Sequence, residues 1–300
     1  MINIQDNWTG RAIASQAAYV EGLIAEALRK NPTVGRLARA FLRGHGRLIA
    51  AGRPHELRRL IESADVLKSA VSSIDYNAFR LDCAAVLDYE AFSRRPIPKW
   101  GAYALCAESK YSMCPYCHQS FAHTLVRDAG GGFRPTLDHY YPKSQYPFLS
   151  LSIFNLVPSC YTCNSQLKGI KDFYLERHVH PFEAADGAIE VAIDLGEYLD
   201  GRERGVDKLR FEIRSSLAHG QRSIETFALN RRFAVNSAYL DSFIARVMAY
   251  VTHRDARASL SQGLKFQLSE SDLLGFDSNN YKDEMLGKIK KDLYDLVLSR

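Results

Sequence analysis

The chain has 300 residues, of which 46% are hydrophobic and 24% charged, and its formal net charge is +5. This composition is typical of a globular protein, and no stretch of about eighteen residues is apolar enough to span a membrane. The first residues also lack the pattern of a secretory signal, in which a basic segment precedes an apolar one. We therefore expect a cytoplasmic protein whose six cysteines stay reduced and serve as metal ligands or buried apolar residues.

The basic charge is concentrated in the first third of the chain. Residues 1–105 hold 15 Lys and Arg against 10 Asp and Glu, whereas residues 183–300 hold 17 against 19. Within residues 29–59, nine basic residues accompany a single acidic residue, Glu56. A local excess of this kind suits a polyanionic partner such as nucleic acid better than the mild overall charge does.

Residues 1–105 are predicted to be helical. Apolar residues recur at helical spacing over 17–28, and Asn31-Pro32 should end that helix. Another helix should follow Thr33. Further helices are expected over 54–71, with Pro54 as the first residue, and over 75–92, with Asp75 as the N-cap.

The predicted helix after Thr33 carries a basic stripe. Four arginines lie at steps of three, four and four residues, so that they share one helix face: Arg36, Arg39, Arg43 and Arg47. The simplest interpretation is a solvated basic surface. Because acidic residues are nearly absent nearby, the stripe is also a candidate surface for the phosphates of a nucleic acid.

Beyond a proline-containing break at residues 95–98, the chain divides into two further regions. Residues 106–182 are rich in cysteine, histidine, aromatic residues and proline, which predicts a compact irregular unit. Residues 183–300 are expected to be mostly helical, with short strands at 189–193 and 209–213, a loop around Gly201–Gly205 and long helices over 222–252 and 281–299. The apolar stripe of the last helix should face the core, or dock a partner or second copy. The expected fold class is therefore mainly α with a small α+β insert in the middle.

Two CxxC pairs predict a metal site. Each pair, Cys114/Cys117 and Cys160/Cys163, can place two thiolates on one tight turn, and two such turns form a tetrahedral all-thiolate zinc site. A redox function is disfavoured because thioredoxin-type motifs have one CxxC in a βαβ setting. Four thiolates close the coordination shell, so we expect a structural Zn²⁺ and regard Cys83 and Cys106 as ordinary buried thiols. His118 could replace a cysteine ligand but is not needed.

The segment enclosed by the two CxxC pairs resembles the HNH endonucleases, also called ββα-metal nucleases. The features that carry the resemblance follow one another in the order of that family: Asp138-His139 with Pro142 downstream, Asn155-Leu156-Val157, Cys163-Asn164 at the second CxxC, and Lys168 four residues later. At the third signature position many members have histidine, whereas this chain has Asn164. The side chain of Asn164 still offers an oxygen atom to a metal. The resemblance covers residues 106–182, about a quarter of the chain.

The resemblance implies a role for each residue of the segment. His139 would be the general base, since a histidine with a pKa near neutrality can activate water. Asp138 and Asn164 would hold Mg²⁺ or Mn²⁺ through oxygen atoms, and Asn155 would brace the bend that carries His139. Lys168 would contact a phosphate or stabilise the fold. Strands near 134–140 and 156–159 and a helix near 161–170 are expected.

The resemblance implies a metal-dependent endonuclease that hydrolyses DNA, with double-stranded DNA as the expected substrate. A looser resemblance to HNH effectors of bacterial anti-phage systems, such as the Septu-type nuclease subunit, implies a defence role and an ATPase partner. Because one such site cuts one strand, a homodimer is also expected. Two alternatives remain open, namely a site-specific restriction-type HNH endonuclease and a non-catalytic zinc module that binds nucleic acid.

Overall fold

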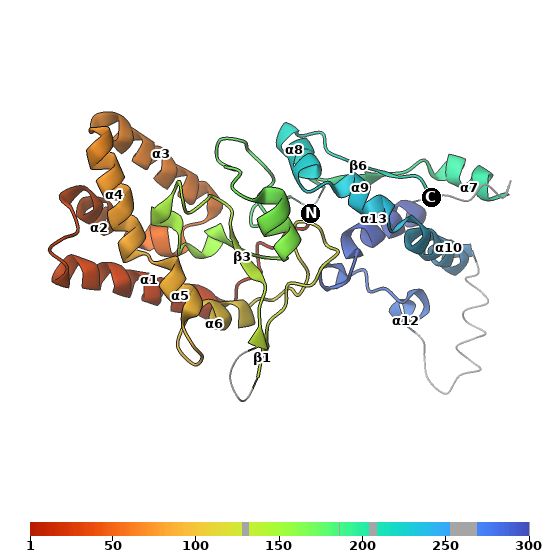
Figure 1. The fold of residues 1–300 in the computed structure, drawn as a ribbon. Helices are drawn as coiled ribbons and strands as arrows, with labels where there is room; N and C mark the ends of the chain where they lie inside the picture. The colour runs from red at the N-terminus through yellow and green to blue at the C-terminus, as the bar shows by residue number, and fades with distance from the viewer. Residues whose placement is uncertain (128–131, 186, 204–208, 253–268, 300) are drawn as a thin grey trace. The chain divides into compact units, whose positions relative to one another are not determined.

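The computed structural model describes residues 1–127, 132–185, 187–203, 209–252 and 269–299, and it is mainly helical, as predicted (Figure 1). The chain forms two compact units. The larger comprises residues 3–115 and 121–184, so residues 3–105 of the helical region and most of the region 106–182 belong to one unit. The smaller comprises 185–300 with 1–2 and 116–120. Within the described residues, none of the helices combines the length and apolar character needed to cross a membrane.

The larger unit begins with a set of packed helices. Their bounds are α1 (Gly10–Lys30), α2 (Arg36–Ala51), α3 (Pro54–Ala70), α4 (Ser73–Val86), α5 (Tyr89–Arg94) and α6 (Ala102–Ala107). The first three agree with the sequence prediction. The expected helix over 75–92 was wrong in two respects, because Ser72 is the N-cap, accepting a hydrogen bond from the Asp75 amide, and the helix stops at Val86 before α5 begins.

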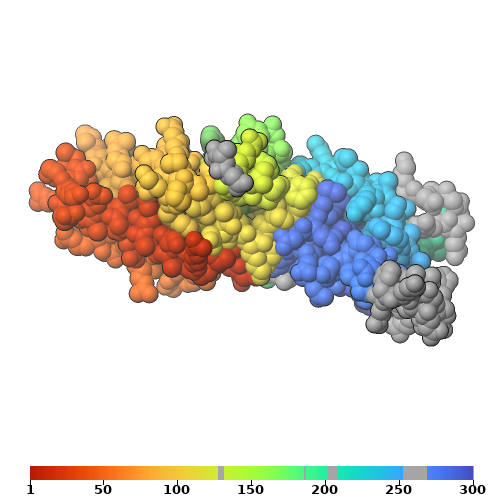
Figure 2. Space-filling view, turned by 90° about the horizontal axis from the view of Figure 1, so that it is seen from below, coloured from red at the N-terminus to blue at the C-terminus, as the bar shows by residue number. Residues whose placement is uncertain are grey.

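An aromatic core holds these helices together. Phe79 of α4 is fully buried and lies 5.2 Å from the ring of Phe41 on α2 and 6.2 Å from that of Phe148. Phe148 belongs to η1 (Pro147–Leu149), a short segment of the central region. The core of the helical region and that of the central region are therefore continuous. In the space-filling view, the red and orange helices close against the yellow residues that follow them (Figure 2).

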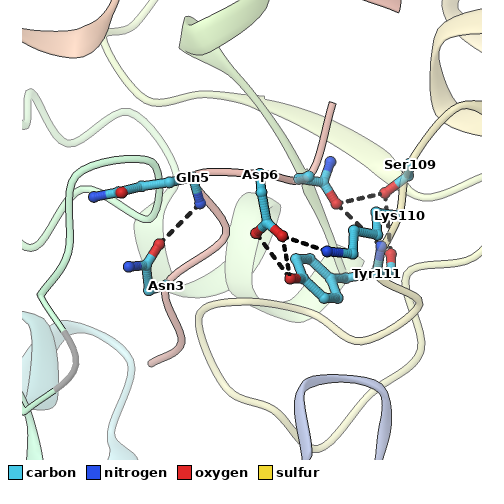
Figure 3. Close-up of polar contacts among 7 residues, drawn as sticks. Asn3, Gln5, Asp6, Ser109, Lys110 and Tyr111 are labelled. Carbon is cyan, nitrogen blue, oxygen red and sulfur yellow. Dashed lines mark hydrogen bonds and ion pairs between the residues drawn. The ribbon is translucent and has the colours of Figure 1, made fainter. Parts of the chain in front are cut away.

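The segment before α1 is tied to the residues that precede the first CxxC pair (Figure 3). The Tyr111 hydroxyl donates to both carboxylate oxygens of Asp6 at 2.8 and 2.9 Å, and the Lys110 ammonium forms an ion pair with the same carboxylate. Ser109 donates its hydroxyl hydrogen to Asn7, whose side-chain oxygen also accepts from the Tyr111 amide. These contacts join two stretches about a hundred residues apart in sequence and fix the approach to Cys114.

The strands of the central region are short. A hairpin pairs β1 (Leu125–Val126) with β2 (Gly132–Phe133), and β3 (Thr136–His139) pairs antiparallel with β4 (Leu156–Ser159), with His139 opposite Leu156. Gly132 has a φ of 131°, and a Cβ there would lie 2.0 Å from the Leu125 carbonyl oxygen. Glycine is therefore required for the close approach of the two hairpin strands. Two further segments complete the region: η2 (Ile153–Asn155) and the π-helix η3 (Thr162–Lys168).

The smaller unit contains the expected short strands, β5 (Glu190–Ala192) and β6 (Glu212–Arg214), paired antiparallel. The single helix expected over 222–252 is three helices, α8 (Ala218–Thr226), α9 (Leu229–Ala234) and α10 (Ser237–Thr252). Ala228 adopts a left-handed conformation with φ of 49°, which breaks the helix without glycine or proline. The expected loop at Gly201–Gly205 was wrong for 201–203, which belong to α7 (Leu195–Glu203), while 204–205 lie outside the described residues. The remaining elements are α12 (Glu270–Leu274), η4 (Tyr281–Asp283) and α13 (Gly287–Leu298), so the helix expected over 281–299 begins later.

The aromatic core predicts a specific stability difference along α4. Phe79→Ala should lower the free energy of unfolding by about 3–5 kcal/mol, because it removes a large buried side chain that its neighbours cannot replace. Ile74→Ala on the same helix serves as the control, since Ile74 is 79% exposed and its truncation should change stability by less than about 0.5 kcal/mol. Urea unfolding followed by circular dichroism measures both, and equal effects would contradict this account of the core.

Candidate active site and metal centre

The five predicted catalytic residues lie on β3, η2 and η3. Asp138 and His139 are the last two residues of β3, Asn155 immediately precedes β4, and η3 carries Asn164 and Lys168. The two strands and the helical segment fall close to the expected ranges. The helix differs in type, since the Gly169 amide bonds to the Asn164 carbonyl five residues earlier at 2.9 Å, which is the π-helical pattern.

Asn155 braces the bend that follows β3. Its side-chain oxygen accepts from the Tyr141 amide at 2.8 Å, and its side-chain nitrogen donates to the carbonyls of Tyr141 and Leu149, both at 3.0 Å. Its own carbonyl accepts from the Tyr140 amide at 2.9 Å. The side chain is fully buried, so these hydrogen bonds are made away from competing water. They hold the chain directly after His139 in one conformation, which is the bracing that the resemblance implied for this residue.

The His139 ring is held at one nitrogen. Nε2 lies 2.9 Å from the Ser150 carbonyl oxygen, so Nε2 carries the proton and donates it, which leaves Nδ1 as the acceptor. Burial lowers the pKa of His139 to about 3, well below the near-neutral value expected from the sequence, so the imidazole is neutral at neutral pH. The ring also meets Tyr89 edge-on, with centroids 4.4 Å apart. The Ser150 hydroxyl in turn donates to the Leu87 carbonyl at 2.5 Å, directly after α4.

Lys168 and Asp138 form a buried ion pair. The Lys168 ammonium lies 2.9 Å from Asp138 Oδ1, and both side chains are only 2% exposed. The same ammonium donates to the His139 carbonyl at 2.7 Å and lies over the Phe173 ring. Of the two roles considered for Lys168, the contacts match stabilisation of the fold, because they tie the end of η3 to the end of β3.

A pocket of about 480 Å³ opens beside these residues. Its lining includes Asp138, His139, Asn164 and Lys168, together with Tyr89 and Lys143. Four of the five predicted site residues therefore meet at one cavity, while the fifth, Asn155, is buried behind it. Asp138 and Asn164 both offer oxygen atoms, the ligand type that Mg²⁺ and Mn²⁺ prefer. Within the described residues the structure holds no cluster of three carboxylate, histidine or cysteine ligands at this pocket.

The four cysteines of the two CxxC pairs gather at one point. The sulfur atoms of Cys114, Cys117, Cys160 and Cys163 all lie within 4.8 Å of one another, and tetrahedral zinc with bonds of about 2.3 Å needs sulfurs about 3.8 Å apart. The Cys163 amide donates to Cys160 Sγ at 3.5 Å, a contact that holds the second CxxC pair in a tight turn. This all-sulfur donor set fits Zn²⁺. Cys83 and Cys106 are buried elsewhere, and burial raises the pKa of each thiol to about 12.

His118 makes other contacts and is not needed at the metal. Its Nε2 lies 3.0 Å from the Lys282 carbonyl oxygen, and its Nδ1 accepts from the Lys288 amide at 2.9 Å. Its own carbonyl accepts from the Leu286 amide at 2.7 Å. The histidine beside Cys117 therefore anchors the start of α13.

The arginine stripe on α2 is not uniform. Arg36, Arg43 and Arg47 are exposed, whereas Arg39 is partly buried. The Arg39 guanidinium donates to the carbonyl oxygens of Leu28 and Asn31, which lie at the C-terminal end of α1. Cations stabilise helix C-termini by bonding to their unpaired carbonyls. Arg39 therefore caps a helix, and three arginines remain as the candidate phosphate-binding surface.

Sequence reasoning missed the residues that position His139 from outside the segment. Trp8 donates its ring N–H to the Ile153 carbonyl at 3.2 Å, and the Gln16 amide donates to the Leu151 carbonyl at 2.7 Å. With the bond from Ser150 to Leu87, these contacts hold the loop over residues 150–153 against the helical region. Neither Trp8 nor Gln16 belongs to a local motif, and both lie more than a hundred residues from their partners, so no sequence signal pointed to them.

The cysteine cluster predicts a zinc content that one substitution removes. The wild-type chain should contain one zinc per chain by elemental analysis, and Cys163→Ser should lose it because three sulfurs leave the tetrahedral shell incomplete. Cys83→Ser is the matched control, a buried cysteine outside the cluster, and should retain zinc. Zinc retained by Cys163→Ser, or lost equally from both variants, would contradict the assignment.

The buried ion pair predicts a large loss of stability when the lysine is removed. Lys168→Met should lower the free energy of unfolding by about 3–5 kcal/mol, since it leaves the Asp138 carboxylate buried without its cation. Lys171→Met is the control, because Lys171 is exposed on the same segment and should matter by less than about 0.5 kcal/mol. The double variant Lys168→Met/Asp138→Leu should recover much of the loss in urea unfolding. A double variant as unstable as the single one would contradict a role through charge compensation.

Comparison with known proteins returns no match. No family model matches the chain, and the searches of curated proteins and of solved structures found no match either. Its function must therefore be inferred from the residues and their geometry.

Proposed function

We propose that this protein is a metal-dependent endonuclease of the HNH type that hydrolyses phosphodiester bonds in DNA. The observation that carries the proposal is the meeting of Asp138, His139 and Asn164 at one pocket, with the bend after His139 braced by the three side-chain hydrogen bonds of Asn155. A general base beside two oxygen ligands is the arrangement that phosphodiester hydrolysis with a divalent cation requires.

His139 is the base in this proposal. A neutral imidazole whose Nε2 proton is held by the Ser150 carbonyl can accept a proton at Nδ1, and a water molecule in the pocket is the source. As the water loses its proton to His139, its oxygen bonds to the phosphorus and the bond from phosphorus to the 3′ oxygen breaks. The 3′ oxygen then takes up a proton from solvent to give the 3′ hydroxyl. The hydrogen bond to Ser150 keeps the ring in one orientation throughout and favours the imidazolium that forms.

Asp138 and Asn164 are the candidate ligands for Mg²⁺ or Mn²⁺. When bound, such a cation would neutralise the charge that develops on the phosphate and the leaving oxygen. Two protein oxygens suffice because Mg²⁺ retains several waters. The Lys168 ammonium shares the Asp138 carboxylate, so we expect weak metal binding and an activity that depends on the metal concentration.

The exposed arginines of α2 are the proposed contacts to the DNA backbone. Arg36, Arg43 and Arg47 lie on exposed positions of one helix, and contacts of this kind would make binding strongly dependent on salt but independent of base sequence. Arg39 is left out of this group because it caps α1.

Plasmid cleavage tests the proposal directly. Purified protein should nick supercoiled plasmid in the presence of Mg²⁺ or Mn²⁺, and EDTA should abolish the activity. His139→Ala should be slower by about 10²- to 10⁴-fold, since it removes the general base. His55→Ala is the matched control, an exposed histidine on α3, and should cleave like the wild type.

Two outcomes would count against the nuclease. Equal cleavage by the wild type and His139→Ala would show that the base is wrongly assigned. Binding of plasmid without cleavage under any divalent metal would favour the alternative of a non-catalytic zinc module.

A further inference from the structure

The β1–β2 hairpin presents apolar side chains to solvent. Phe121, just before the hairpin, is 64% exposed, and Phe133 on β2 and Leu125 on β1 are each 47% exposed. The antiparallel register places Leu125 directly opposite Phe133, so these two side chains lie on the same face. The hairpin is anchored, because the Tyr103 hydroxyl donates to the Gly132 carbonyl at 3.0 Å. The exposed rings therefore sit on a supported strand pair.

The aromatic rings form a continuous group. His123 lies between the two phenylalanines, with its ring centroid 5.4 Å from that of Phe121 and 5.1 Å from that of Phe133. Both contacts are edge-on, at interplanar angles of 89° and 83°. His123 is itself exposed. Such contacts stabilise the orientation of each ring while leaving much of its surface accessible.

The aromatic group is joined to the proposed active-site pocket by the chain itself. Phe133 is followed by Arg134, which lines the pocket with His139, and β3 begins two residues later. The Arg134 guanidinium is fixed by hydrogen bonds to Pro135 O and Ser93 Oγ at 2.9 and 2.8 Å. Among the described residues 119–127 and 132–137, the charged side chains are Arg127 and Arg134. An anionic ligand at the pocket would therefore meet the positive charge of Arg134 next to Phe133.

We propose that Phe121, His123 and Phe133 form a stacking platform for unpaired nucleobases next to the cleavage site. The proposal rests on the proposed function for the chemistry at the pocket, and it adds that nucleic acid with unpaired bases beside the scissile phosphate binds more tightly than a fully paired duplex. Exposed aromatic rings beside arginines are the combination that binds single strands without reading sequence, because every base has a face that can stack. Paired bases inside a duplex do not offer those faces.

A nucleic acid fits this surface better than a protein partner does. A protein partner bound to these rings would bury them, but it would not account for the arginines or for the position of Phe133 next to a residue of the pocket. Phosphates can follow Arg127 and Arg134 while bases meet the rings, so both kinds of side chain are used.

Binding by a cleavage-deficient full-length chain tests the platform. With His139→Ala as the background and no divalent cation, cleavage plays no part, so this test can fail independently of the nuclease proposal. Fluorescence anisotropy is measured with a labelled oligothymidylate of about 20 nucleotides and with a blunt duplex of equal length. Adding Phe121→Leu/Phe133→Leu should weaken binding of the single strand by at least about tenfold, while duplex binding should change by less than about twofold.

Two further variants separate stacking from general apolar contact. Phe121→Tyr/Phe133→Tyr keeps both rings and should bind the single strand like the background protein. Leu81→Ala, an exposed apolar residue on α4, is the control for loss of surface area and should have no effect. Unchanged single-strand binding by the leucine variant would overturn the proposal. An equal loss of affinity for the single strand and the duplex would also overturn it. A change of oligomeric state in light scattering without a loss of single-strand binding would overturn it as well, and would indicate a protein interface.

Discussion

The position of His139 depends on one buried asparagine. Asn155 uses its whole side chain on backbone groups of the bend between β3 and η1, accepting from the Tyr141 amide and donating to the Tyr141 and Leu149 carbonyls. Successive side chains of a strand point to opposite faces, so adjacent residues such as Asp138 and His139 can line one pocket only where the strand ends and bends. A bend leaves backbone groups unpaired, and buried unpaired groups are costly. Asn155 satisfies those groups, and the bend is thereby stabilised in the form that the pocket requires.

The helices of the N-terminal region also help to position His139. His139 donates to Ser150, Ser150 donates to Leu87 after α4, and Gln16 of α1 donates to Leu151. The ring orientation of His139 is thus set through side chains and carbonyls that lie far away in the sequence. The helical region and the central region also share an aromatic core. Unfolding of the helices should therefore disrupt the geometry of the candidate active site. The N-terminal helical region, which the sequence shows only as basic and helical, therefore supports the candidate active site.

Local signals in the sequence were sufficient for part of this structure. Pro54 marks the start of α3 because its fixed backbone angle suits a first turn. The two CxxC pairs predicted the cysteine cluster because each spacing can place two sulfurs on one turn and two such turns form a zinc site. Other features depend on distant contacts that no local pattern encodes. Ala228 breaks the expected helix over 222–252 in a left-handed conformation that its side chain does not favour, so tertiary packing must impose it. Arg39 belongs to a regular stripe of arginines, yet its guanidinium donates hydrogen bonds to carbonyls at the end of α1. The sequence likewise did not predict that Lys168 pairs with Asp138, because the pair forms only where the ends of β3 and η3 meet.

The ion pair between Lys168 and Asp138 explains how the carboxylate that we propose as a metal ligand can be buried before any metal binds. An isolated carboxylate in such a place would be protonated or would destabilise the fold, and neither outcome leaves a ligand for a hard cation. The Lys168 ammonium compensates the charge of Asp138 at 2.9 Å and is itself held by the His139 carbonyl at 2.7 Å. The carboxylate is therefore paired with a cation and held beside the pocket. The same compensation reduces the net negative charge that would attract a divalent cation, so a phosphate arriving with its own charge should strengthen metal binding. Substrate and metal are then expected to bind cooperatively, each supplying charge that the other needs.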